Sequence, residues 1–270
     1  MKERNILLTI EYDGTCFYGW QRQPHARTVQ GELEQVLSKV CGIPVKINGT
    51  SRTDAGVHAL GQQASFKGTF GIPTDRLKMA VNNMLSGGKQ SREKCSDVRI
   101  KDVKEMPEDF HARFDSKGKK YRYLISCADE PDIFRRNYCY QVKEELDTEA
   151  MKKAAGYIAG THDFACFQSA GGNVRETTVR TVYSLDIKED GKDISIEIAG
   201  DGFLYNMVRI ITGTLVEVGK GRKKPEELKD IIGSRDRTKA GHTAPAEGLY
   251  LVEVYYDEKE SEAFSDAEIK

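Results

Sequence analysis

Hydrophobic and polar residues alternate along several short stretches of the chain, and this alternation predicts β-strands. In the first half we expect strands over 6–12, 45–48, 59–66 and 98–103. In the second half we expect them over 121–125, 183–187, 194–198 and 250–256. The pair Asp190-Gly191 lies between the two middle strands of the second half, which predicts a β-hairpin there.

Apolar residues recur at helical spacing between these strands. Helices are predicted over 29–40, 74–85, 147–160, 203–218 and 225–232. The first has Thr28 as its expected cap and Gly42 just past its end. Each half therefore mixes helices with antiparallel strands, which predicts an α+β fold. Two halves of β-α-β-β-α-β type favour a duplicated ferredoxin-like unit.

The composition is that of a globular protein, with 39% hydrophobic and 31% charged residues among 270. No apolar run reaches the roughly 18 residues that a membrane helix needs. The first residues lack the apolar core of a signal peptide. Six cysteines are scattered without a Cys-x-x-Cys pair, which predicts reduced thiols in a cytoplasmic protein and no zinc site.

The net charge of −1 is unevenly distributed along the chain. Residues 257–270 carry −4, so the remainder carries +3. Basic residues cluster at 113–136, 220–224 and 235–239. Such clusters can contact phosphates even when the total charge is near zero, and they can equally be solvated loops.

The segment 49–58 reads Gly-Thr-Ser-Arg-Thr-Asp-Ala-Gly-Val-His and holds one carboxylate, Asp54, among small residues. A loop of small residues can bring a carboxylate and backbone groups close to a substrate. An aspartate that only caps its own turn has the same local pattern. His58 follows four residues later, and without a third ligand nearby we expect a hydrogen-bonded structural histidine rather than a metal ligand.

Several blocks in this chain occur together and in order in one family. They are Arg52-Thr53-Asp54-Ala55-Gly56-Val57-His58, Glu11-Tyr12-Asp13-Gly14, Tyr18-Gly19-Trp20-Gln21-Arg22-Gln23, Phe110-His111-Ala112-Arg113-Phe114, Lys120-Tyr121-Arg122-Tyr123, Asn206-Met207-Val208-Arg209 and Ala246-Glu247-Gly248-Leu249-Tyr250-Leu251. With them, residues 6–254 resemble the TruA family of tRNA pseudouridine synthases. The segment 86–96 departs from the family, because it is longer and more polar than the usual short turn.

The resemblance implies two ferredoxin-like halves that form a continuous, mostly antiparallel sheet, with helices on one side and a central active-site cleft. Residues 1–108 would be the half with the catalytic Asp loop, and residues 109–270 the half with the Tyr and Arg of the site. It also implies an isomerase that converts uridine to pseudouridine at positions 38 to 40 of the tRNA anticodon stem-loop. The partners would be tRNA and a second copy of the chain in a homodimer, without a cofactor or a metal.

The resemblance further implies a role for five residues. Asp54 matches the catalytic carboxylate and Arg209 the arginine that pairs with it. Tyr121 matches the tyrosine that stacks on the uracil, and of the two strand tyrosines we expect Tyr123 to be the core residue. Arg52 matches an arginine that fills or steers the position of the flipped base, although a phosphate contact or a loop salt bridge is an equal alternative. Leu249 matches an apolar wall of the pocket and could equally be core.

The residues themselves fit this chemistry. A nearby cation favours the ionised form of Asp54. Arg209 stands in an apolar stretch, where an unpaired guanidinium would be costly. The carboxylate could attack the sugar, attack the base or remove a sugar proton. A non-catalytic RNA-binding module and a nucleoside hydrolase are the alternatives, although a hydrolase ordinarily uses two acids and the motif loops supply only one.

Overall fold

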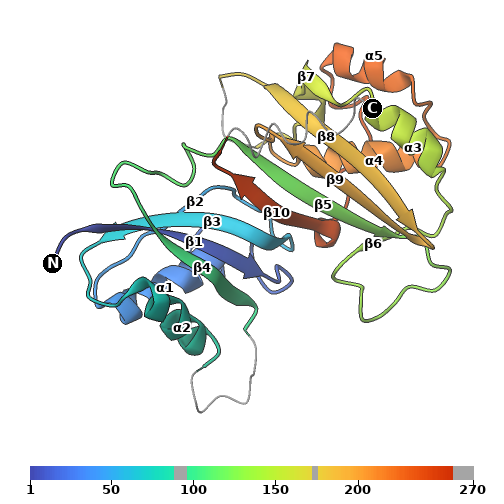
Figure 1. Cartoon of the computed structure of the whole chain (residues 1–270). Coiled ribbons are helices and arrows are strands. Elements are labelled where there is room, and N and C mark those ends of the chain that lie inside the picture. Colours follow the sequence, from blue (N-terminus) through green and yellow to red (C-terminus); the bar gives the residue numbers. More distant parts are fainter. Residues whose placement is uncertain (88–95, 172–175, 258–270) are drawn as a thin grey trace. The chain divides into compact units, whose positions relative to one another are not determined.

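The structure is a computed structural model that describes residues 1–87, 96–171 and 176–257. The chain divides into two compact units, one of Met1–Ser116 with Leu251–Val254 and one of Lys117–Tyr250 with Tyr255–Lys270 (Figure 1). The division of roles between 1–108 and 109–270 stays a prediction. Most of the segment 86–96, which departs from the family, lies outside the described residues. The same holds for all but the first residue of the acidic segment 257–270.

The first unit has the expected ferredoxin-like order of elements. In chain order they are β1 (Arg4–Tyr12), α1 (Val29–Cys41), β2 (Asn48–Gly49), β3 (His58–Gly68), α2 (Thr74–Leu85) and β4 (Val98–Met106). Strand β1 pairs antiparallel with β3 and β4, and β2 pairs antiparallel with β3. The strand order is therefore β4-β1-β3, with the short strand β2 paired to β3 off this path, and α1 and α2 lie together on one face of the sheet (Figure 1).

The second unit repeats the strand-helix-strand-strand-helix pattern and adds further short elements. Its elements are β5 (Gly118–Ser126), β6 (Tyr140–Gln141), α3 (Thr148–Ala155), β7 (Gly160–Asp163), β8 (Val179–Asp190), β9 (Asp193–Gly200), α4 (Met207–Gly219) and α5 (Glu227–Ser234). The pattern is formed by β5, α3, β8, β9 and α4, and the additions are the short strands β6 and β7 and the helix α5. The last strand, β10 (Leu249–Tyr255), has its middle residues, Leu251–Val254, in the first unit. Strand β9 pairs antiparallel with both β5 and β8, while β6 runs parallel to β5. The α+β class and the mostly antiparallel pairing are confirmed, and the cleft between the halves stays a prediction.

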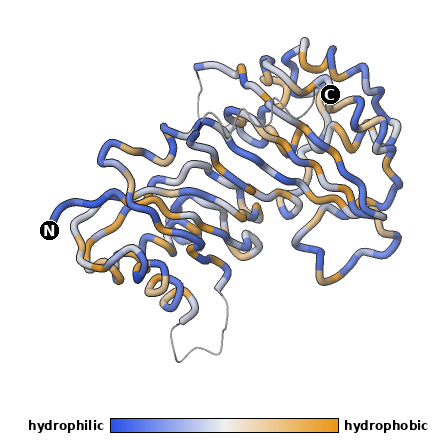
Figure 2. The backbone as a smooth tube through the Cα atoms, viewed as in Figure 1, coloured by the Kyte–Doolittle hydropathy of each residue, from blue (hydrophilic) through white to orange (hydrophobic). Residues whose placement is uncertain are grey.

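Burial alternates along part of the strands, as in the second half of β1, whereas residues 5–8 of β1 are all buried. In β1 the side chains of Ile6, Leu8 and Ile10 are fully buried. Hydrophobic and hydrophilic positions likewise alternate along the strands in Figure 2. Thr28 caps α1 by accepting a hydrogen bond from the backbone N–H of Gly31, and Gly42 ends it in the left-handed conformation, both as expected.

The predicted strand over 45–48 is wrong for all but its last residue. The backbone N–H of Val45 donates to Oγ of Ser38, and that of Ile47 donates to Oε1 of Glu34. Both acceptors are side chains of α1. Because backbone donors need one partner each, these two are satisfied by the helix instead of a strand ladder.

Three helices have bounds that differ from the prediction by more than a single residue, and the one expected over 225–232 runs from Glu227 to Ser234. The helix expected over 147–160 ends at Ala155, and 3-10-like bonds at Tyr157 and Ile158 lead into β7, a strand that the sequence did not reveal. The helix expected over 203–218 begins at Met207, because Asn206 adopts a left-handed backbone with φ 60°. In the described part of the chain no helix is long and apolar enough to cross a membrane.

Candidate active site

The Asp54 loop is held by the residues on either side of the carboxylate. Thr53 is buried, with Oγ1 2.7 Å from Oη of Tyr12 on β1. Its carbonyl accepts the backbone N–H of Trp20 at 3.0 Å. Asp54 itself is half-buried and Arg52 is exposed. Thr53 is therefore fixed in the core, while the carboxylate of Asp54 lies at the boundary with solvent.

A glycine allows a second segment to approach the loop closely. Gly19 has φ +85°, and a Cβ there would lie 2.7 Å from the carbonyl oxygen of Thr53. Only a residue without a side chain fits this conformation and this space. The Tyr18-Gly19-Trp20 segment therefore braces the backbone of the Asp54 loop directly.

Deeper contacts fix the start of the same loop. Gln62 on β3 donates from Nε2 to the carbonyl of Ser51 at 2.7 Å, and its Oε1 accepts the backbone N–H of Ser51 at 3.2 Å. The hydroxyl of Thr50 donates to the carbonyl of Ala112 at 3.0 Å. Polar side chains buried with their partners in this way hold a single loop conformation.

His58 is a buried, hydrogen-bonded residue at the end of the loop, with 1% of its surface exposed. Its Nδ1 lies 3.0 Å from the backbone nitrogen of Gly14 and 3.2 Å from Oδ1 of Asp13. The first contact requires an unprotonated Nδ1 and the second a protonated one. Because a backbone N–H can only donate, Nδ1 of His58 accepts from Gly14. His58 is therefore neutral, with its proton on Nε2. Among the described residues, no three His, Cys, Asp or Glu side chains are grouped to hold a metal ion.

Arg209 lies in the first turn of α4 between the buried residues Val208 and Ile210. Its Nε donates to the carbonyl of Ala244 at 2.8 Å, and its Nη1 donates to Oδ1 of Asn206 at 2.9 Å. Both acceptors are neutral, so neither offsets the positive charge. The apolar stretch thus carries a half-buried guanidinium that is hydrogen-bonded.

The two tyrosines of β5 are both buried but differ in their contacts. The ring of Tyr121 is 8% exposed and meets Phe203 edge-to-face, with ring centroids 5.2 Å apart. Tyr123 is fully buried, and its hydroxyl donates to the carbonyl of Pro245 at 2.7 Å. Burial above all raises the pKa of the Tyr123 hydroxyl, with Glu247 also raising it and Arg209 lowering it. Tyr123 is thus the core residue of the pair, as expected.

The predicted site residues fall into two groups. Asp54 and Arg52 share one loop of the first unit, whereas Tyr121, Arg209 and Leu249 belong to the second. Within the second unit the segment 244–249 joins Arg209 to β5, because Ala244 bonds Arg209 and Pro245 bonds Tyr123. Leu249 follows in that segment and is 7% exposed.

Sequence reasoning missed Phe203 and Asn206. Nothing in the local sequence shows that Phe203 meets Tyr121 across the turn after β9. Asn206 lies within the Asn-Met-Val-Arg block, but the pattern assigned a role only to its arginine.

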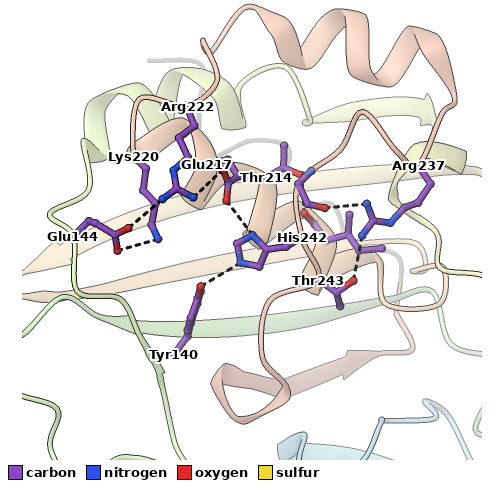
Figure 3. A network of polar contacts seen from close by, with 11 residues as sticks. Tyr140, Glu144, Thr214, Glu217, Lys220, Arg222, Arg237, His242 and Thr243 are labelled. Atoms are coloured by element: carbon purple, nitrogen blue, oxygen red, sulfur yellow. Dashed lines mark hydrogen bonds and ion pairs between the residues drawn. The ribbon is translucent and has the colours of Figure 1, made fainter.

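Many cations of the predicted basic clusters are paired with carboxylates. On β5, Lys120 and Arg122 both bond Glu197 of β9, at 2.7 Å each. The Lys220 ammonium and the Arg222 guanidinium bond Glu144 at 3.0 and 3.2 Å (Figure 3). The pKa of the Glu144 carboxyl lies below its ordinary value, mainly because Lys220 donates a hydrogen bond to it. These cations are therefore partly neutralised within the protein, and a phosphate contact would have to compete with the existing pairs.

Comparisons with known proteins point to one family. A family profile described as tRNA pseudouridine synthase matches residues 8–115 and 154–257. The tRNA pseudouridine synthase A of Acetivibrio thermocellus is 51% identical over 253 residues, which is 94% of this chain and 100% of that protein. The enzyme of the same name from Ruminiclostridium cellulolyticum is 51% identical over 255 residues, with the same coverage. A tRNA pseudouridine synthase A 2 from Clostridium perfringens is 47% identical over 253 residues, again with 94% of this chain and 100% of that protein.

Proposed function

Because the chain belongs to the family of tRNA pseudouridine synthases, we propose that it converts uridine to pseudouridine at positions 38 to 40 of the tRNA anticodon stem-loop, with Asp54 as catalytic carboxylate. The observation that carries this proposal is the family match over both units, which includes Arg52, Asp54, Arg209 and Leu249. Tyr121 falls between the two matched ranges, and its role rests on the Lys-Tyr-Arg-Tyr block and on its place on β5.

The reaction rearranges atoms that the substrate already holds. The bond between C1′ and N1 breaks, the uracil turns, and C5 bonds to C1′. The proton of C5 then leaves and N1 gains one, so substrate and product have the same composition. Such an isomerisation needs a carboxylate beside the sugar, a surface for the free base and exclusion of water, and it needs no cofactor.

The braced loop suits Asp54 to this task. A carboxylate that is half-buried on a fixed backbone can be presented to a sugar with little loss of entropy on binding. In our proposal Asp54 attacks the sugar, attacks the base or removes a sugar proton. Arg209 would pair with it, favour its ionised form and stabilise charge that develops in the transition state.

The remaining residues would hold the flipped uridine. A base taken out of a stem costs a few kcal/mol to extrude, and a ring face recovers about 1–3 kcal/mol per base by stacking. Tyr121 would provide that ring, Leu249 an apolar wall, and Arg52 a cation at the vacated position or on a phosphate. We further propose that the protein acts as a cytoplasmic homodimer, as the resemblance implies.

The test is to incubate unmodified tRNA transcripts with the purified protein in the absence of any cofactor. Carbodiimide-dependent primer extension then maps pseudouridine, and a transcript with cytidine at positions 38 to 40 is the matched control. We expect product at one or more of these positions and none in the control. Tight tRNA binding without product would instead indicate an RNA-binding module, and release of free uracil would indicate a hydrolase.

A further inference from the structure

Asn206 has a backbone conformation that most residues avoid. Its φ and ψ are 60° and 8°, in the left-handed region, directly before the first residue of α4. This region costs about 1–2 kcal/mol for an ordinary L-residue, and asparagine tolerates it better than most. In the described residues only His25 and Arg235 share it among non-glycines.

The side chain of Asn206 bridges two residues that are far apart in sequence. Its Oδ1 accepts from Nη1 of Arg209 at 2.9 Å, and its Nδ2 donates to Oγ of Ser169 at 3.0 Å. Because a guanidinium can only donate, the amide oxygen must face Arg209, which fixes the orientation of the amide group. The amide therefore fixes one edge of the Arg209 guanidinium.

A second contact fixes the adjacent nitrogen of the same guanidinium. Nε of Arg209 donates to the carbonyl of Ala244, whose own N–H donates to the carbonyl of Arg209 at 3.0 Å. Two neutral acceptors thus hold Nε and Nη1 and set the plane of the group. Because a planar guanidinium interacts directionally, its plane decides which way its remaining donors can point.

The loop segment that carries Ala244 is itself clamped to α4. A Cβ at Gly213 would lie 1.9 Å from the carbonyl oxygen of His242, and the N–H of Gly241 donates to Oγ1 of Thr214 at 2.8 Å. The imidazole of His242 lies between Glu217 and Tyr140, 3.2 Å from each (Figure 3). The Ala244 contact is therefore made by a clamped backbone, whereas the Asn206 contact is made by a side chain that a substitution can remove.

We propose that Asn206 is a positioning residue for catalysis, which sets the plane of the Arg209 guanidinium through its bridge to Ser169. This rests on the proposed function, in which Arg209 acts on the catalytic carboxylate. Asn206 does not touch the reacting atoms. The left-handed backbone of Asn206 is unfavourable in itself, and it places the amide oxygen within reach of Nη1 of Arg209.

The test compares Asn206→Gly with Asn206→Ala, because glycine accepts the left-handed backbone and alanine does not. Both remove the amide. We expect kcat for pseudouridine formation to fall by about 100-fold in both, as for a misplaced catalytic group, with KM for tRNA nearly unchanged. The melting temperature should fall further in the alanine variant than in the glycine variant, because only alanine also strains the left-handed backbone. His25→Gly, at another left-handed residue, is the matched control and should keep the original kcat.

Ser169→Ala tests the other end of the bridge without touching the backbone of residue 206. It should lower kcat by a smaller factor, about 3- to 10-fold, on the scale of one neutral hydrogen bond. The double variant with Asn206→Gly should be no slower than Asn206→Gly alone, because the bridge is already broken. If Asn206→Gly does not fold, a fall in kcat in Ser169→Ala with an unchanged melting temperature supports the inference.

Several outcomes would overturn the proposal. An unchanged kcat in Asn206→Gly would show that Arg209 acts without the Asn206 bridge. If that variant does not fold, an unchanged kcat in Ser169→Ala would show the same. A kcat that follows the melting temperature from variant to variant would show that Asn206 serves stability alone. If the unaltered protein forms no pseudouridine, the proposed function itself fails. If the unaltered protein is active and substitution of Asn206 leaves kcat unchanged, only the inference about Asn206 fails.

Discussion

Oη of Tyr12 and Oγ1 of Thr53 lie 2.7 Å apart in the buried interior of the first unit. This hydrogen bond joins β1 to the residue immediately before Asp54. A strand with fully buried side chains thereby supports the loop that presents the carboxylate. The position of Asp54 therefore depends on the core of the sheet.

We predict that Tyr12→Phe destabilises the protein by about 1–2 kcal/mol, because it leaves a buried hydroxyl with one partner fewer. Thr53→Val should cost a similar amount. Urea unfolding of both single variants and the double variant measures the coupling between them. A double variant that costs the full sum of the singles would show that the two hydroxyls do not stabilise each other.

Gly19→Ala should be considerably more damaging than an ordinary glycine substitution. The new Cβ would combine a left-handed backbone with a 2.7 Å approach to the Thr53 carbonyl, and we expect a loss of about 2–5 kcal/mol. Gly42→Ala is the matched control, because Gly42 has φ +69° but no atom within 4 Å of the Cβ position. It should lose only about 1 kcal/mol. Equal losses in the two variants, measured by urea unfolding, would contradict the close approach.

The pair of cations on Glu197 predicts a dependence of stability on pH. Burial acts to raise the pKa of Glu197, but the hydrogen bonds from Lys120 and Arg122 outweigh it, and the pKa lies below its ordinary value of 4.5. A carboxyl with a depressed pKa stabilises the fold above its unfolded pKa and loses that effect as the pH falls through its folded pKa.

Glu197→Gln should therefore lower the free energy of unfolding at pH 7 by about 1–3 kcal/mol, as expected for a hydrogen-bonded charge. Near pH 3 the difference from the unaltered protein should shrink. Glu226→Gln, which removes an exposed partner of Lys153, is the control and should have little effect at either pH. A difference for Glu197→Gln that is constant across this range would rule out the depressed pKa.

The sequence predicted most elements of the fold because their signals are local. Strand β1 is an example, since Leu8, Ile10 and Tyr12 alternate with the polar residues Thr9 and Glu11 and are buried. The segment over 45–48 has a similar pattern but forms almost no strand. Its backbone bonds Glu34, a carboxylate that is only 6% exposed, and this partner on the preceding helix, 13 residues away from Ile47, leaves no signal in the segment itself.

The site residues also differ in whether the sequence could reveal them. Asp54 and Arg209 could be singled out because whole motif blocks carry them. The bridge by Asn206 could not, because its partner Ser169 is 37 residues away and its left-handed backbone follows from tertiary contacts. The contact of Phe203 with Tyr121 likewise depends on how the chain turns after β9.

The most direct test of the central claim is single-turnover pseudouridine formation by Asp54→Asn, measured together with its dissociation constant for unmodified tRNA. The amide preserves the shape of the side chain and removes the charge. We predict no detectable product while the dissociation constant stays within about threefold, or about 0.7 kcal/mol, of that of the unaltered protein. Product at the unaltered rate, or loss of tRNA binding together with activity, would contradict the assignment of Asp54 as the catalytic carboxylate.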